Sequence, residues 1–248
     1  MKFKELIKKI NLHEGVYDKG IFKAFFLAGG PGSGKTFVTA QAFAGTGLRV
    51  INSDRAFENA MKKAGLSLKM PDSEQEVRDM VRARAKATTQ KMLDLSLDGR
   101  LGIIIDGTAD KLDKITNLKN ALNHLGYDCY MIFVNTSLDV ALERNAQRER
   151  SVPEFVTIQS WKNCQANIGH LQRVFGGGNF IVVDNNKSAQ ELVTQTLNRV
   201  SKVVAEYMRR PIQNYTAKKW VAHELELRKN KAEMGDAFRH LKTGNYGK

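Results

Sequence analysis

FKAFFLAGGPGSGKT, residues 22–36, is an apolar run that breaks into glycines and ends in a Lys-Thr pair. The apolar run indicates a short buried strand, and the residues after the glycines indicate a helix. Gly29, Gly34, Lys35 and Thr36 match the phosphate-binding loop pattern G-x-x-x-x-G-K-[ST], which requires this strand and helix on its two sides. A glycine-rich turn that binds nothing is the alternative, and it does not explain why all four features occur together and in order.

The residue types of this loop predict its chemistry. Glycines let the backbone turn its N–H groups inward toward phosphate oxygens, and the start of the helix adds a partial positive charge. Lys35 is expected to reach the β and γ phosphates and the Thr36 hydroxyl to ligate Mg²⁺, so ATP and Mg²⁺ are the predicted cofactors. The residues expected to bind the nucleotide are Gly30, Pro31, Gly32, Ser33, Gly34, Lys35, Thr36, Phe37 and Arg148.

Strands and helices are predicted to alternate along the rest of the chain. This alternation implies an α/β fold with a doubly wound parallel sheet of about five strands, followed by a C-terminal helical extension. With the phosphate-binding loop after the first strand, the arrangement resembles the P-loop NTPases of the nucleoside-kinase-like type. The predicted strands are residues 22–28, 48–52, 101–105, 129–134 and 180–183. We expect an N-terminal helical segment at 1–20, a kinase domain at 21–210 and a basic C-terminal helical tail at 211–248, the last docking through Trp220.

Composition limits the possible classes of protein. The hydrophobic share of 42% is ordinary for a globular protein, and no stretch is apolar enough to cross a membrane. The first residues, MKFKELIKKI, lack the features of a secretory signal, so we expect a cytoplasmic protein with no membrane contact. Cys129 and Cys164 have no metal-binding spacing and are predicted to be reduced core thiols.

The net charge of +13 indicates a polyanionic partner, most obviously nucleic acid. A kinase that handles several phosphates also gathers Lys and Arg, so the charge alone does not identify the acceptor. On the long helix expected at 74–97, Arg78, Arg82 and Lys86 form a basic row that is either a solvated face or the wall of an acceptor groove. Whether a protein inhibitor also binds is left open.

Acidic residues follow two of the predicted strands, where ligands bind in parallel sheets. Asp54 is placed to accept the proton of an acceptor hydroxyl, although it could instead cap the following helix, as Ser53 could. Asp106 could contact Mg²⁺ indirectly or hold the acceptor. Because Gly107 and Thr108 follow Asp106 where water-activating ATPases commonly carry Glu, and no guanine-reading Asn-Lys-x-Asp motif occurs, a kinase is favoured. The residues expected to bind the acceptor are Asp54, Arg55, Asp106 and Thr108, and those expected to bind the metal are Thr36 and Asp106.

Three arginines follow the fourth predicted strand. Arg144 and Arg148 lie one helical turn apart, and Arg150 comes in the loop after them. Such a group is suited to place positive charge over a transferring phosphoryl group. The competing interpretation is a solvated helix face, because Glu143 and Glu149 could pair with the arginines locally.

Four motifs, GGPGSGKT, INSD, IIIDGT and ERNAQRERSVPE, occur in an order that resembles the P-loop kinases that include the zeta toxins and the phage polynucleotide kinases, over residues 22–184. The resemblance implies that Lys35 and Thr36 bind nucleotide phosphates and Mg²⁺. It also implies that Asp54 is the acceptor base and that Arg144 and Arg150 are lid arginines, which with Lys35 make the expected catalytic set.

The two branches of this family favour different acceptors. Asp106-Gly107-Thr108 is similar to the Glu-Gly-Thr of zeta toxins, whereas Val152 and Pro153 are similar to the polynucleotide kinases. Phe57 stands where the polynucleotide kinases carry an arginine. We expect an ATP- and Mg²⁺-dependent kinase that phosphorylates a hydroxyl of a polynucleotide or nucleotide-like acceptor. The alternatives are a zeta-toxin-like UDP-N-acetylglucosamine kinase and, from another class, an ATP-switched nucleic-acid-binding protein without kinase activity.

Overall fold

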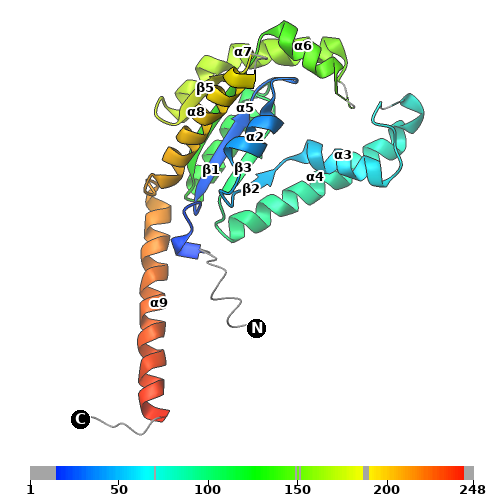
Figure 1. The fold of residues 1–248 in the computed structure, drawn as a ribbon. Helices are drawn as coiled ribbons and strands as arrows, with labels where there is room; N and C mark the ends of the chain where they lie inside the picture. The colour runs from blue at the N-terminus through cyan, green and yellow to red at the C-terminus, as the bar shows by residue number, and fades with distance from the viewer. Residues whose placement is uncertain (1–14, 70, 149, 151, 187–189, 243–248) are drawn as a thin grey trace.

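A parallel five-stranded sheet forms the centre of the molecule (Figure 1). The computed structural model describes residues 15–69, 71–148, 150, 152–186 and 190–242. The strands are β1 (Lys23–Ala28), β2 (Arg49–Ile51), β3 (Ile103–Asp106), β4 (Asp128–Asn135) and β5 (Phe180–Asp184). Every neighbouring pair is parallel, in the order β2-β3-β1-β4-β5. The predicted doubly wound sheet is therefore confirmed.

Helices connect the strands and extend the chain beyond the last one. The α-helices are α2 (Lys35–Ala42), α3 (Ser53–Lys63), α4 (Gln75–Asp98), α5 (Leu112–His124), α6 (Leu138–Ala146), α7 (Glu154–Phe175), α8 (Gln190–Arg209) and α9 (Tyr215–Lys242). Two short 3₁₀ helices, η1 (Gly15–Tyr17) and η2 (Asp72–Glu74), accompany them. Residues 1–14 of the expected N-terminal helical segment lie outside the described residues.

Each face of the sheet is covered by its own helices, as Figure 1 shows. On one face α5, α7 and the start of α9 pack over alternate residues of β1 and β4, for example Phe26 and Met131. On the other face α2 and α8 pack over the residues in between, such as Phe25 and Ile132. Because β1 is buried along its whole length, it needs the continuous apolar run that the sequence provides. Cys129 and Cys164 are buried free thiols, as expected.

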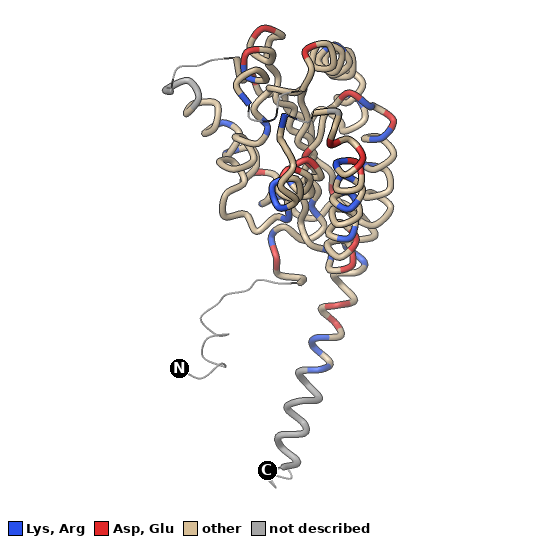
Figure 2. The backbone as a smooth tube through the Cα atoms, turned by 90° about the vertical axis from the view of Figure 1, so that its right-hand side faces the viewer, with Lys and Arg blue, Asp and Glu red and all other residues tan. Residues whose placement is uncertain are grey.

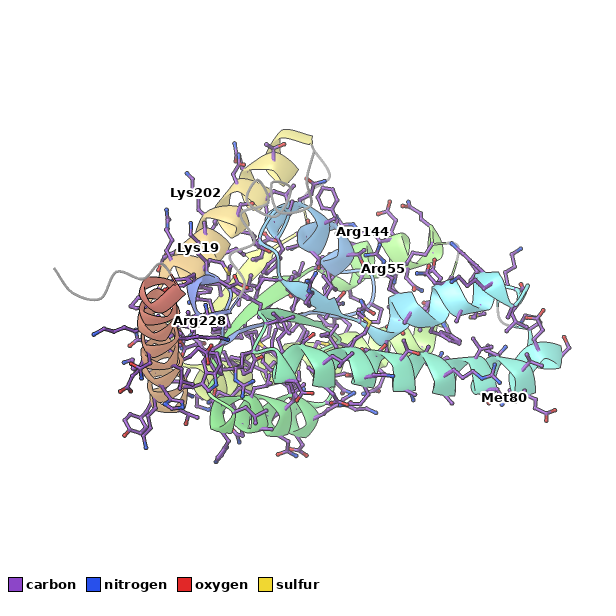
Figure 3. The ribbon with its side chains drawn as sticks, turned by 90° about the horizontal axis from the view of Figure 1, so that it is seen from below. Lys19, Arg55, Met80, Arg144, Lys202 and Arg228 are labelled. Carbon is purple, nitrogen blue, oxygen red and sulfur yellow. The ribbon has the colours of Figure 1, made fainter. Side chains whose placement is uncertain are left out.

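Helices α3 and α4 form an arm that extends sideways from the sheet (Figure 1). Along α4 the buried side chains are Val81, Ala85, Thr89, Leu93 and Ser96, which repeat every three or four residues. Apolar residues on the other side of the helix, including Met80 and Leu95, are 52% and 60% exposed, and Figure 3 shows Met80 on the outer half of the arm. In the described part of the chain this outer half packs against α3 and against Leu66 and Leu68 in the segment after it, and its other side faces solvent. Helical spacing alone therefore does not predict which apolar residues are buried.

The long helix α9 starts at the edge of the sheet where the strands begin. Trp220 packs edge-on against Phe22, with ring centroids 5.5 Å apart, and the Arg100 guanidinium lies 4.8 Å from the Trp220 ring centroid. The predicted docking through Trp220 is therefore found. Further along, α9 leaves the body of the molecule (Figure 1). None of the helices in the described part of the chain combines the length and apolarity needed to span a bilayer.

Lys23 is a buried cation at the start of β1 that ties α8 to the sheet. Its Nζ donates hydrogen bonds of 2.8 and 2.7 Å to the carbonyl oxygens of Tyr207 and Arg210, at the end of α8. Burial lowers the pKa of Lys23, an effect that the charge of Asp128 opposes. The ammonium group thus satisfies two carbonyls that the end of a helix leaves without intrahelical donors.

Replacing Lys23 by Met should lower the free energy of unfolding by about 1–3 kcal/mol, because the thioether fills the space but cannot donate to the two carbonyls. Urea denaturation measures this change. Lys19→Met, at an exposed position, is the matched control and should change stability by less than about 0.5 kcal/mol. Equal stability of the two variants would contradict the role assigned to Lys23.

Candidate active site

The ends of three neighbouring strands bring the predicted site residues to one edge of the sheet. β3 lies between β1 and β2, and Leu27 of β1 is in register with Asp106 of β3. Ile51 of β2 is in register with Ile105. The phosphate-binding loop after β1, Asp106 at the end of β3 and Asp54 after β2 therefore lie along the same edge, as the strand-end argument predicted.

Two glycines allow the phosphate-binding loop to fit between the elements around it. Gly32 has φ +76°, and a Cβ there would lie 2.2 Å from the carbonyl oxygen of Ala141 in α6. Gly34 has φ +89°, and its Cβ would lie 2.3 Å from the side-chain nitrogen of Asn185, just after β5. Both positions combine a left-handed backbone with close contact, so any side chain would displace the loop.

Lys35 points into the loop rather than into solvent. Its Nζ donates to the carbonyl oxygens of Gly29 at 2.7 Å and Gly30 at 3.0 Å, and lies 3.4 Å from Ser33 Oγ. Burial lowers the pKa of Lys35, while the negative charges of Asp106 and Asp54 oppose this effect. The loop therefore surrounds a cation that is positioned to meet an anionic phosphate.

Asn185 and Arg144 hold the loop from the side of β5. The Asn185 side chain donates to the Ser33 carbonyl at 2.8 Å, and Arg144 Nη1 donates to the Asn185 carbonyl at 2.9 Å. Arg144 thus supports the loop through Asn185, in addition to the lid role predicted for it. Sequence analysis missed Asn185, since a single asparagine after a strand gives no periodic or motif signal.

Asn52 connects the end of β3 to the start of α3. Its Oδ1 accepts hydrogen bonds from the backbone N–H groups of Asp54 and Arg55, and its Nδ2 donates to Asp106 Oδ2 at 2.5 Å. The cap of α3 is therefore Asn52, and the expectation that Ser53 or Asp54 caps this helix was wrong. The reason is that Ser53 and Asp54 already belong to the helix, which begins at Ser53, whereas Asn52 has the extended backbone of a cap residue.

Because Asn52 caps the helix, the carboxylate of Asp54 is available for other contacts. Its side chain is 68% exposed and lies 3.4 Å from Nη2 of Arg150, whose own side chain is only 14% exposed. This ion pair joins the loop after α6 to the α3–α4 arm. It places Arg150, one of the predicted lid arginines, beside Asp54, the predicted acceptor base.

Asn145 fixes the loop that carries the predicted arginines. It is 5% exposed, and its side chain both donates to the Val152 carbonyl at 2.7 Å and accepts from the Val152 N–H at 3.0 Å. Within this loop Arg148 lies close enough for its charge to lower the pKa values of Lys35 and Asp106. The predicted pairing of the arginines with Glu149 concerns a residue outside the described part of the chain.

Other predicted site residues lie at the margin of this group. Arg55 is exposed, and in Figure 3 it lies on the same side of the molecule as Arg144. Phe37 is 45% exposed at the start of α2.

Thr108 is exposed and its hydroxyl donates a 2.7 Å hydrogen bond to Asp110, two residues further along the same loop. Gly30 lies against Trp161 of α7, where a Cβ on Gly30 would be 3.6 Å from the Cα of Trp161. Pro31 follows Gly30 in the phosphate-binding loop.

Thr36 and Asp106 fit the Mg²⁺ site predicted for them. Mg²⁺ prefers hard oxygen ligands and commonly uses only one or two carboxylates together with substrate phosphates. The Thr36 hydroxyl is exposed at the start of α2, and burial raises the pKa of Asp106 while the charge of Lys35 opposes the rise. No cluster of three or more His, Cys, Asp or Glu side chains suited to a metal occurs among the described residues.

Comparison with known proteins gives one family match. The family model described as "AAA domain" matches residues 25–171, which include the phosphate-binding loop, Asp54, Asp106 and the three arginines. No curated protein matches the sequence.

Several solved structures are similar to this chain. A gluconokinase from Sinorhizobium meliloti is 16% identical with a TM-score of 0.44, covering 75% of this chain and 95% of its own. A shikimate kinase from Bacteroides thetaiotaomicron is 12% identical with a TM-score of 0.45, covering 74% and 98%. A structure of the PezAT toxin-antitoxin system of Streptococcus pneumoniae is 14% identical with a TM-score of 0.44, covering 84% and 95%.

Replacing Asp106 by Asn should stabilise the protein at neutral pH when no nucleotide is bound. Since burial raises the pKa of Asp106 in the folded state, its charged form opposes folding above that pKa. This destabilisation by the ionised carboxylate becomes smaller as pH decreases through the folded-state pKa of Asp106. It disappears below the pKa that the carboxyl group has in the unfolded chain. Urea midpoints measured across a pH series should therefore show a gain for Asp106→Asn at neutral pH that shrinks toward acid.

Asp79→Asn removes the same charge from an exposed position of α4 and serves as the control, with an expected change below about 0.5 kcal/mol at every pH. If Asp106→Asn is less stable than the wild type at neutral pH, the ionised carboxylate of Asp106 does not oppose folding, which would contradict this prediction.

Proposed function

The chain belongs to the AAA domain family, and from this membership we propose that it is an ATP- and Mg²⁺-dependent kinase that phosphorylates a hydroxyl group of a polynucleotide or nucleotide-like acceptor. One arrangement carries the proposal. The carbonyl oxygens of the glycine loop accept hydrogen bonds from the Lys35 ammonium, and burial lowers the pKa of Lys35 while the charges of Asp106 and Asp54 oppose this effect. The carboxylate of Asp54 is exposed and pairs only with Arg150 among the described residues. A phosphate-binding loop with an exposed carboxylate at the same edge of the sheet is what phosphoryl transfer to a hydroxyl requires.

The reaction assigns a role to each of these groups. The loop amides and Lys35 hold the triphosphate, and Asp54 accepts the proton of the acceptor hydroxyl as its oxygen attacks the γ phosphorus and ADP leaves. Arg150 supplies positive charge beside Asp54, Arg148 supplies it near Lys35, and Arg144 keeps the lid role predicted for it. Bound Mg²⁺, held through Thr36 and Asp106, would neutralise charge on the phosphate oxygens.

Support for an anionic acceptor comes from the site rather than from α9. Figure 2 shows acidic as well as basic residues along the described part of α9, and Arg228 pairs with Glu224 at 3.1 Å. In addition, α9 docks where the strands begin, at the edge opposite the phosphate-binding loop. The start of α9 therefore lies away from the phosphate-binding loop, and a role of the basic tail in binding a polyanion stays a prediction.

A zeta-toxin-like kinase acting on UDP-N-acetylglucosamine is the second candidate, favoured by Asp106, Gly107 and Thr108 as a match to the zeta-toxin motif. Incubation with labelled ATP and either a 5′-hydroxyl oligonucleotide or the sugar nucleotide separates the two candidates. Label that appears only on the sugar would reject the polynucleotide acceptor.

Asp54→Asn should reduce the rate of phosphoryl transfer by about 10²- to 10⁴-fold while leaving ATP affinity within a few-fold, since the amide keeps its size but cannot accept the proton. Lys35→Ala should instead weaken ATP binding, because it removes the charge inside the loop. Single-turnover transfer and equilibrium ATP titration measure the two effects.

The matched control for Asp54→Asn is Glu58→Gln, which removes one charge from the next turn of α3, where Glu58 pairs with Lys62 at 3.1 Å. It should retain full activity. An ATP-switched binding protein would show no phosphoryl transfer in the wild type and no effect of Asp54→Asn, and that outcome would reject the kinase.

A further inference from the structure

The ring of Phe57 brings together two guanidinium groups from different parts of the chain. Phe57 is 2% exposed on α3, one turn after Asp54. The guanidinium carbon of Arg82, from α4, lies 4.3 Å from the ring centroid, and that of Arg150, from the loop after α6, lies 5.6 Å from it. Arg150 also pairs with Asp54, so the Phe57 ring connects Arg82 to the residue that lies beside the predicted acceptor base.

Arg82 differs from the other members of the basic row on α4. Arg78 donates to the Pro71 carbonyl at 2.9 Å and so holds the loop at the tip of the arm, and Lys86 is exposed. Arg82 is half-buried, and its guanidinium lies over the Phe57 ring. In the described part of the chain it forms no ion pair with a carboxylate and donates no hydrogen bond. Its five N–H donors are therefore free to bind an anion.

The charges around the site also leave Arg82 uncompensated. Asp54 pairs with Arg150, and the charge of Asp106 acts on Lys35 and is in turn affected by Arg148. Among the described residues, no carboxylate pairs with the guanidinium of Arg82. A half-buried cation is costly unless an anion accompanies it, and the contact with the Phe57 ring offsets only part of this cost.

We propose that Arg82, oriented by the face of Phe57, binds a phosphate group of the acceptor and makes the enzyme select a phosphate-bearing alcohol over its uncharged counterpart. The inference rests on the proposed kinase function. It places the recognised phosphate on the acceptor itself, at a position apart from the hydroxyl that reacts at Asp54. Nucleotides, nucleic acids and nucleotide sugars all carry such a group, and the experiment distinguishes them.

The position of the guanidinium over the ring favours arginine rather than lysine here. A guanidinium over an aromatic ring can still offer two parallel hydrogen bonds to phosphate, a geometry that an ammonium group does not provide. The ring also limits the motion of the side chain, which lowers the entropy lost on binding.

The test compares matched pairs of acceptors in the wild type and in two variants. The pairs are a nucleoside 3′-monophosphate with its nucleoside, and UDP-N-acetylglucosamine with N-acetylglucosamine. For the pair that the wild type uses, Arg82→Met should lower the ratio of kcat/KM for the charged over the uncharged acceptor by about 10- to 100-fold, the range expected for a lost hydrogen bond to a charged group. Arg82→Lys should lower this ratio less, because the positive charge remains.

Two controls separate recognition from structure. Lys86→Met removes an exposed charge one turn along α4 and should leave the ratio unchanged. Arg82→Met keeps an apolar contact with Phe57, so its thermal midpoint should stay near that of the wild type. Equal loss on charged and uncharged acceptors, or an unchanged ratio in Arg82→Met, would overturn the role of Arg82 while leaving the kinase assignment in place. Absence of transfer to every acceptor by the wild type would instead overturn the proposed function.

Discussion

The candidate site depends on how closely the phosphate-binding loop approaches the elements on its two sides. At Gly32 the loop passes so near the Ala141 carbonyl that no side chain fits, and at Gly34 it lies against Asn185. Both contacts need glycine for space and for its left-handed backbone. The loop is therefore held between α6 and the end of β5, and its carbonyl groups close around the Lys35 ammonium.

The same contacts connect the loop to the rest of the site. Helix α6, which the loop touches at Ala141, also carries Arg144 and Asn145. Asn145 fixes the segment that places Arg150 beside Asp54 and Phe57 on the arm. Helix α6 therefore contacts the phosphate-binding loop on one side and, through Asn145, holds the segment that carries Arg150 on the other.

Much of this arrangement could be predicted from local sequence. The buried strand β1 follows from an uninterrupted apolar run, and the loop follows from the spacing of glycines with a Lys-Thr pair. Because parallel strands end at one edge, residues that directly follow strands, such as Asp54 and Asp106, could be expected there together. These predictions succeed since each depends on neighbouring residues or on the topology alone.

The remaining features depend on contacts between distant parts of the chain. Asn52 and Asn185 bond to partners 54 and 152 residues away, and a single asparagine carries no pattern that identifies such a partner. The stacking of Arg82 on Phe57 likewise requires α3 and α4 to pack in one particular register. The exposure of Met80 and the docking edge of α9 depend on what each helix packs against, which helical spacing does not specify.

Calorimetric titration with MgATP tests the central claim, using the wild type, Gly32→Ala and Gly45→Ala. Gly45 has φ +72°, close to the φ +76° of Gly32, yet nothing lies within 4 Å of a Cβ there, so this variant has similar backbone strain without the contact. We predict that the wild type and Gly45→Ala bind MgATP alike and that Gly32→Ala binds at least about 10-fold more weakly, a loss of about 1.4 kcal/mol. No binding by the wild type, or equal binding by Gly32→Ala, would contradict the account.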